Sequence, residues 1–222
     1  MKYVVEPGIG ATYSLSIGHV DIYFLKGKLR PNMTIYDIGA NRGKHALFFG
    51  KYIGNGGKIL SFEPVPSVYQ SLVANLKLNK LSQVESFCVA VSDTEGKASF
   101  LFSEANCTQG KLAHCEVAFK IDSARTLEVD TITLDGLVAR GASAPDLLKI
   151  DVEGAALKVL RGASQLLEKK APEVFIELHG PEEQAGVRDE LIGRGYVAET
   201  LEGDRVHDPS RSWHSPLWCY KP

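Results

Sequence analysis

Two glycines follow a short apolar run of the chain and could bring the backbone close to a ligand. Residues 34–38 are typical of a buried strand, and the run Asp37-Ile38-Gly39-Ala40-Asn41-Arg42-Gly43 leads from its end into a helical pattern. Glycine permits a tight turn, and the start of the helix offers free N–H groups. The dinucleotide fingerprint G-x-G-x-x-G is not matched, because three residues separate these glycines. The carboxylate of Asp37 favours a cationic ligand such as S-adenosylmethionine. A purely structural turn capped by Asp37 is the alternative.

Polar residues also end the next two predicted strands. Glu63 follows Asp37 by 26 residues, which is a suitable place for a carboxylate that accepts both hydroxyls of a ribose. Ser92 and Asp93 come at the end of the third strand, where either could meet the amino group of an adenine. The alternatives are a solvated acid before Pro64 and a simple turn residue at Asp93.

Four ionisable residues stand in two i, i+2 pairs at the ends of later strands, Asp151 with Glu153 and Glu177 with His179. Period two places each pair on one side of its strand, so the four groups should converge at the carboxyl edge of the sheet. His179 is the first candidate for the base that deprotonates a methyl-accepting hydroxyl, and Glu153 is the second. A divalent metal on Asp151, Glu177 and His179 is an alternative. Helix capping and an ordinary loop histidine are the structural alternatives.

Strands and helices must alternate to position these residues, and the apolar periodicity predicts that they do. Strands are predicted at 34–38, 57–62, 84–91, 147–151, 173–178, 196–200 and 218–220, and helices at 44–52, 67–79, 154–169 and 183–194. Parallel neighbours need crossover helices. We therefore expect one α/β domain over 1–222, with a mostly parallel sheet and helices on both faces.

Two segments interrupt the alternation. Residues 96–102 and 125–134 alternate apolar and polar positions and flank the polar loop 103–114. They predict inserted strands and a loop, within 94–146, that lie near the acceptor. Residues 1–32 are expected to form an N-terminal extension packed on the core.

The composition excludes several classes of protein. The chain has 222 residues, 44% of them hydrophobic, and a net charge of −2, so neither general disorder nor the basic surface of a nucleic-acid binder is expected. No apolar run reaches the roughly 18 residues of a membrane span, and the first residues lack a secretory h-region. These features predict a cytoplasmic protein without membrane insertion. The cysteines show no metal-binding spacing and are expected to be reduced thiols.

Five runs of the sequence together resemble the successive blocks of FkbM-type S-adenosylmethionine-dependent methyltransferases. They are DIGANRG at 37–43, FEP at 62–64, AVSD at 90–93, LKIDVEG at 148–154 and IELH at 176–179. The resemblance implies a Rossmann-like class I sheet whose last strand is antiparallel, and O-methylation of a sugar or another natural-product hydroxyl. The chain departs from the family pattern at Ala156, where a second glutamate is usual, and at Lys44 and His45.

The strand ends and the resemblance together assign the residues of the site. The expected cofactor-binding residues are Asp37, Gly39, Ala40, Asn41, Gly43, Glu63, Pro64, Ser92 and Asp151. The expected catalytic residues are Asp151, Glu153 and His179. The expected partner is a small-molecule or glycan acceptor. A nicotinamide-dependent oxidoreductase is disfavoured by the glycine spacing, and a non-catalytic adenosyl-binding module is the other alternative.

Overall fold

The computed structural model describes residues 2–3, 13–14, 24, 27–103, 110–113, 115, 125–206 and 216–222. Most of the expected N-terminal extension, and residues 104–109 and 114 of the polar loop, lie outside them. Within the extension, β1 (Lys2–Tyr3) and β2 (Tyr13–Ser14) pair in antiparallel fashion. Phe24 is fully buried in an aromatic cluster against the main sheet.

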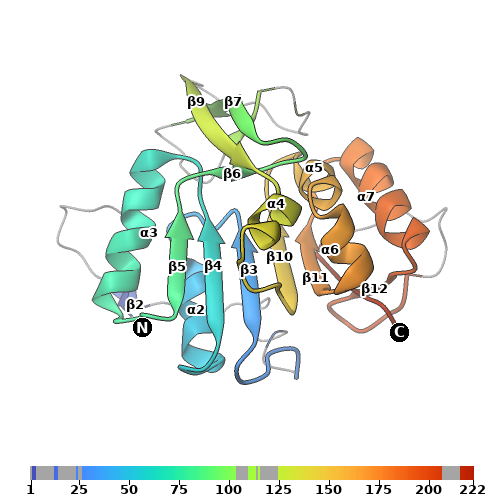
Figure 1. Ribbon diagram of the computed structural model, residues 1–222, viewed down its shortest axis with the longest axis horizontal. Helices are drawn as coiled ribbons and strands as arrows, with labels where there is room; N and C mark the ends of the chain where they lie inside the picture. Colours follow the sequence, from blue (N-terminus) through green and yellow to red (C-terminus); the bar gives the residue numbers. More distant parts are fainter. Residues whose placement is uncertain are drawn as a thin grey trace.

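A seven-stranded sheet forms the centre of the molecule (Figure 1). Its strands in spatial order are β12 (Val197–Thr200), β13 (Leu217–Tyr220), β11 (Glu173–Glu177), β10 (Leu147–Asp151), β3 (Thr34–Ile38), β4 (Lys58–Phe62) and β5 (Val84–Phe87). The five strands from β11 to β5 pair in parallel, whereas β13 runs antiparallel to both of its neighbours. This arrangement confirms the predicted α/β class and the antiparallel last strand.

Helices cover both faces of the sheet, because its central strands are apolar on both sides. In β3, Ile35 packs into the cluster that contains Phe48 of α2 (Lys44–Tyr52), whereas Tyr36 packs into the cluster on the other face. Figure 1 shows α2 behind the sheet and α4 in front of it. Against α2 lies α3 (Pro66–Leu78). The second face is covered by α4 (Leu134–Ala139), α5 (Ala156–Arg161), α6 (Ser164–Lys169) and α7 (Pro181–Gly193).

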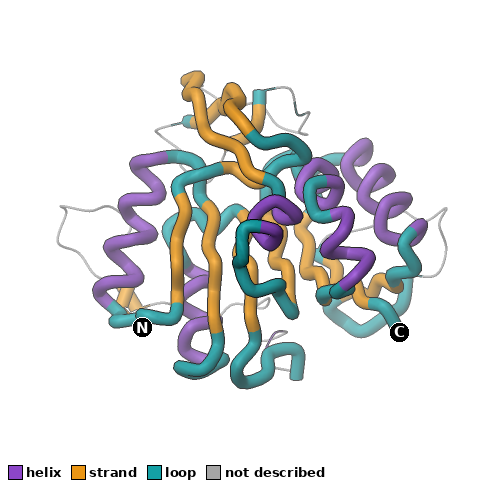
Figure 2. The backbone as a smooth tube through the Cα atoms, in the orientation of Figure 1, coloured by secondary structure: helices purple, strands orange, loops and turns teal. Residues whose placement is uncertain are grey.

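A second sheet lies across the carboxyl ends of the main strands (Figures 1 and 2). In spatial order it contains β6 (Ala90–Val91), β9 (Arg125–Ile132), β7 (Gly96–Phe102) and β8 (Gly110–Leu112). The prediction of one strand at 84–91 is therefore wrong, since the chain leaves the main sheet after Phe87 and its next strand joins the second sheet. The apolar pattern does not show this break, because Val89, Ala90 and Val91 are apolar residues that line a pocket between the two sheets.

The strand predicted at 125–134 ends earlier and is followed by a helix that the sequence pattern did not reveal. Thr133 lies between β9 and α4, and its Oγ1 accepts the N–H of Gly136 at 3.0 Å. A threonine in this position is a normal helix cap. With only six residues, α4 is too short to show a helical apolar period.

The single helix predicted at 154–169 is two helices, α5 and α6, which meet at Gly162. The carboxylate of Asp135 in α4 accepts the N–H groups of Gln165 and Leu166, both at 2.9 Å. Asp135 therefore caps the start of α6, and it does so from a part of the chain about 30 residues away.

None of the helices among the described residues combines the length and the apolar character needed to cross a bilayer. Cys88, Cys115 and Cys219 carry free thiols. Cys107 lies outside the described residues.

Candidate active site

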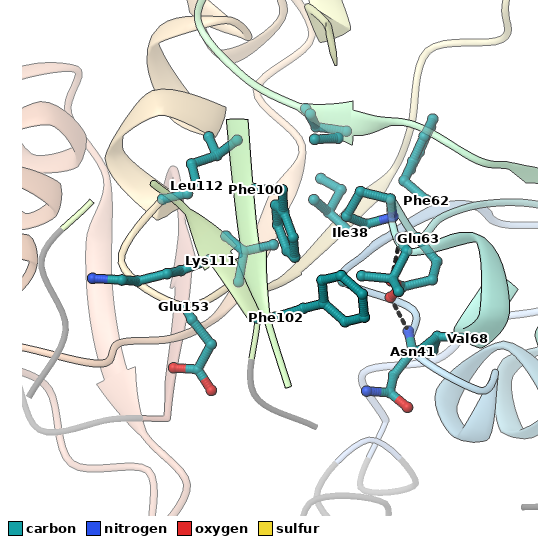
Figure 3. Close-up of a pocket in the computed structure, with 18 of the residues that line it drawn as sticks. Ile38, Asn41, Phe62, Glu63, Val68, Phe100, Phe102, Lys111, Leu112 and Glu153 are labelled. Carbon is teal, nitrogen blue, oxygen red and sulfur yellow. Dashed lines mark hydrogen bonds between the residues drawn. The ribbon is translucent and has the colours of Figure 1, made fainter. Parts of the chain in front are cut away.

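A pocket opens between the carboxyl ends of β3, β4 and β10 and the facing strands β7 and β8 of the second sheet (Figure 3). Its empty volume, including the solvent at its mouth, is about 820 Å³. A concave site lined by apolar side chains and a few polar groups is the usual kind of small-molecule site. Six of the residues predicted from the sequence line the pocket, namely Gly39, Asn41, Glu63, Pro64, Asp151 and Glu153.

The glycine turn after β3 is held against the end of β4. The N–H groups of Gly39 and Ala40 both donate to the carbonyl oxygen of Phe62, at 3.1 and 2.9 Å. Gly39 has a φ of +78°, and a Cβ atom there would lie 1.9 Å from the carbonyl oxygen of Asp151. Both the dihedral angle and the close approach require glycine at this position.

We expect Gly39→Ala to lower the free energy of unfolding by about 2–5 kcal/mol, because the new methyl group would overlap the backbone of Asp151 at a positive φ. Gly54→Ala is the matched control, since Gly54 has a φ of +75° but a Cβ atom there would meet no other atom within 4 Å. That variant should lose only about 1 kcal/mol. Urea unfolding measures both, and equal losses would show that the close approach has no energetic effect.

Glu63 is the most enclosed carboxylate in the wall of the pocket, with 6% of its surface exposed. Its Oε2 accepts the N–H of Asn41 at 3.0 Å, and its Oε1 accepts the N–H of Val65 at 2.9 Å (Figure 3). Burial raises the pKa of Glu63 to about 7, although the two N–H groups oppose this shift. Each oxygen keeps a lone pair for a ligand.

Asp37 has a different position from the one expected. Its side chain is fully buried and lies 3.3 Å from Nζ of Lys149, and it does not line the pocket. Lys149 is itself only 1% exposed, and its Nζ also lies 3.3 Å from Oδ2 of Asp151 and 3.2 Å from the carbonyl oxygen of Gly39. Burial opposes the charged ammonium, but Asp151 and Asp37 raise the pKa of Lys149 above its usual value. Asp37 therefore lies beside a buried lysine instead of facing the pocket, and burial raises its pKa while Lys149 opposes this shift.

We expect Lys149→Met to lower the free energy of unfolding by about 3–5 kcal/mol, because the fully buried carboxylate of Asp37 would lose its counter-charge and the half-buried carboxylate of Asp151 would keep only His179. Adding Asp37→Asn should recover part of this loss, since one of the two carboxylates is then neutral. Urea unfolding of the single and double variants tests the prediction. An unchanged free energy of unfolding in the single variant would mean that the ammonium of Lys149 does not stabilise the fold.

His179 connects the two carboxylates of the predicted catalytic set. Its Nε2 lies 3.2 Å from Oδ1 of Asp151, and its Nδ1 lies 3.0 Å from Oε2 of Glu153. The contact of Nε2 with Asp151 is a hydrogen bond, whereas the contact of Nδ1 with Glu153 is an ion pair that requires a protonated ring. Burial opposes protonation, but Asp151 and Glu153 raise the pKa of His179 above its usual value. His179 therefore lies between two carboxylates that favour its protonated form.

The two carboxylates differ in proton affinity. Burial would raise the pKa of Asp151, but Lys149 and His179 hold it well below its usual range. Burial raises the pKa of Glu153 to about 7; His179 opposes this shift, and Asp151 adds to it. Glu153 lines the pocket, whereas His179 does not. The geometry thus favours Glu153 over His179 as the group that can accept a proton from a bound molecule.

Glu177 is the register partner of Asp151 in the neighbouring strand but does not line the pocket. Burial and the charge of Asp151 raise its pKa. Across the described ranges, no group of three or more His, Cys, Asp and Glu side chains is arranged to hold a metal ion. The alternative set of Asp151, Glu177 and His179 is thus not such a group.

Three more of the predicted cofactor residues, Ala40, Gly43 and Ser92, do not line the pocket. Ser92 follows β6 of the second sheet, where its N–H donates to the carbonyl oxygen of Ile132 at 2.9 Å. Its hydroxyl lies 3.1 Å from the carboxylate of Asp93. Ser92 does not line the pocket because the chain has already left the main sheet after Phe87, which is also why the strand predicted at 84–91 is interrupted.

The sequence analysis expected inserted strands near the acceptor but named none of the side chains that form the roof of the pocket. Phe100 and Phe102 of β7 and Leu112 of β8 face the strand ends, and in Figure 3 Phe102 lies between Glu63 and Glu153. The alternation within 96–102 contained this signal, since residues two apart share one face of a strand. Lys111 also lines the pocket, and its Nζ donates to the carbonyl oxygen of Cys115 at 2.6 Å.

Comparisons with known proteins identify the family of this chain. Residues 37–198 match the family described as "Methyltransferase FkbM domain". The chain is 31% identical over 209 residues to "Methyltransferase sdnD" of Sordaria araneosa, covering 82% of this chain and 76% of that one. It is 28% identical over 213 residues to "31-O-demethyl-FK506 methyltransferase FkbM" of Streptomyces tacrolimicus, covering 81% and 80%.

A solved structure shows the same fold. The crystal structure of methyltransferase FkbM from Methylobacillus flagellatus superposes with a TM-score of 0.60 at 18% identity, covering 93% of this chain. The present chain spans about half of that protein, since 48% of it is covered. The family match, over residues 37–198, includes the residues that line the pocket. The chain belongs to the FkbM methyltransferase family.

Proposed function

We propose that the protein transfers a methyl group from S-adenosylmethionine to a hydroxyl group of a small molecule or glycan. The observation that carries the proposal is the buried carboxylate of Glu63, which lines an open pocket beside the glycine turn. Family membership supports methyl transfer, and the name of the Streptomyces relative describes methylation at an oxygen.

The pocket residues fit an adenosyl ligand. A carboxylate with a free lone pair on each oxygen can accept both hydroxyls of a ribose, and Glu63 is already fixed by the N–H groups of Asn41 and Val65. Val68 and Val89 offer an apolar surface beside it for a purine ring. The close approach of Gly39 to β10 keeps side chains out of the space in front of the strand ends.

When bound, S-adenosylmethionine supplies an electrophilic methyl group on a sulfonium. An aliphatic hydroxyl needs a base, and Glu153 lines the pocket with a pKa of about 7 caused chiefly by burial. We assign the base to Glu153, which takes the hydroxyl proton on its carboxylate. His179 is a positioning residue in this scheme, because its two nitrogens fix Asp151 and Glu153 relative to each other.

The proposal is tested by calorimetry with S-adenosylmethionine, S-adenosylhomocysteine and NAD, followed by a methyl-transfer assay with a labelled donor. The assay should use a panel of sugars, macrolides and other hydroxylated compounds. We expect both adenosyl ligands to bind, NAD not to bind, and label to enter at least one acceptor. Binding of NAD alone would overturn the proposal. Binding without transfer to any acceptor would favour the non-catalytic adenosyl-binding module.

A further inference from the structure

Glu183 joins the two loops that carry the proposed catalytic groups. It belongs to the first turn of α7, and 8% of its surface is exposed. Its Oε2 accepts the N–H of His179 at 2.8 Å, and its Oε1 accepts the N–H of Ala156 at 2.8 Å. His179 lies in the loop between β11 and α7, whereas Ala156 begins α5 after the loop that follows β10.

Helix capping explains only one of these two bonds. A glutamate in the first turn commonly reaches back to an N–H group just before its own helix, as Glu183 does with His179. The other carboxylate oxygen of Glu183 accepts the N–H of Ala156, which lies outside α7 and 27 residues away in the chain. Since the N–H groups at a helix start have no partner inside the helix, this bond anchors α5 to α7.

The two loops joined by Glu183 carry Glu153 and His179, whose relative positions matter for proton transfer from the acceptor. The loop before Ala156 contains Glu153, which lines the pocket, and the other loop contains His179. Nδ1 of His179 lies 3.0 Å from Glu153, so the same two loops are joined twice, once at the side chains and once through Glu183. Glu183 itself does not line the pocket.

We propose that Glu183 is a positioning residue for methyl transfer, which holds Glu153 at the reacting hydroxyl by fixing both loops. The proposal rests on the proposed function, because it assigns Glu153 the role of base. Glu183 acts on the acceptor side of the pocket, and its contacts do not include the turn at Gly39 or the carboxylate of Glu63. Its loss should therefore affect turnover and leave binding of the donor intact. Misplacement of a catalytic group by about 1 Å can cost about 100-fold in rate.

The test compares Glu183→Ala and Glu183→Gln with the control Glu182→Gln, which removes a charge from the same first turn of α7 at an exposed position. We expect Glu183→Ala to lower kcat about 10- to 100-fold, with the KM for S-adenosylmethionine and the Kd for S-adenosylhomocysteine within about twofold of wild type. Glu183→Gln keeps one good acceptor oxygen and should fall between Glu183→Ala and wild type. The control should match wild type.

Hydrogen exchange gives a readout that does not depend on activity. We expect faster exchange at 153–156 and 178–180 in both Glu183 variants, with no change at the glycine turn 39–43. Unchanged exchange in the two loops, or an unchanged kcat in a variant whose melting temperature alone has fallen, would overturn the proposal. An equal loss of donor affinity and turnover would also overturn it. Failure of the proposed function is distinct, since wild-type protein would then bind no adenosyl ligand or transfer no methyl group.

Discussion

Glu63→Gln should weaken the binding of S-adenosylmethionine and S-adenosylhomocysteine about 10- to 100-fold. Each hydrogen bond to a charged group contributes about 1.5–3 kcal/mol, so two bonds from a ribose to the carboxylate supply at least about 3 kcal/mol. The amide keeps only one acceptor oxygen and no charge. The same oxygens also fix the N–H groups of Asn41 and Val65, so the turn that frames the pocket would lose an anchor.

Calorimetry measures this effect, and circular dichroism shows whether the variant remains folded. Glu85→Gln is a suitable control, because Glu85 lies in the neighbouring strand β5 with 55% of its side chain exposed and pairs only with Lys58 among the ion pairs of the described residues. The control should bind both ligands as wild type does. Wild-type affinity in a folded Glu63→Gln protein would remove Glu63 from the cofactor site.

Glu153→Gln should lower kcat about 10²- to 10⁴-fold, the usual contribution of a positioned base, while the Kd for S-adenosylhomocysteine stays within a few-fold of wild type. The amide has nearly the same shape as the carboxylate but cannot accept the hydroxyl proton. Because Glu153 and Glu63 line different parts of the pocket, the loss of one should not affect the role of the other (Figure 3). Steady-state kinetics and calorimetry separate the two effects.

The pH dependence of kcat gives a second test of the base. Burial raises the pKa of Glu153 to about 7, so below this pH the group is protonated and cannot accept a proton. The rate should therefore rise with pH through about 7 and level off above it. We expect this acid limb to disappear in Glu153→Gln and to persist in His179→Gln. The reverse result would assign the base to His179.

The central fold could be predicted because its signals are local. The runs at β3, β4, β10 and β11 are short and apolar, and each is followed by polar residues and a helical pattern. The errors arose where contacts distant in sequence decide the structure. The carboxylate of Asp135 caps the start of α6 from about 30 residues away. The chain leaves the main sheet after β5, and β6 pairs with β9, which follows it by more than 30 residues.

The site could be predicted to the level of strand ends but not to the direction of each side chain. Glu63 and Glu153 lie in loops after their strands and face the pocket. Asp37 lies inside β3, opposite Lys149 in the register of β10, so the two side chains share one face of the sheet and pair there. A lysine within the apolar run of β10 was the available signal, since a buried ammonium needs a carboxylate partner.

A crystal structure of the complex with S-adenosylhomocysteine would place the adenosyl group relative to Glu63. We expect both ribose hydroxyls within hydrogen-bond distance of the Glu63 carboxylate, with the sulfur directed toward the side of the pocket that holds Glu153. An adenosyl group bound elsewhere, or a ribose without contact to Glu63, would contradict it.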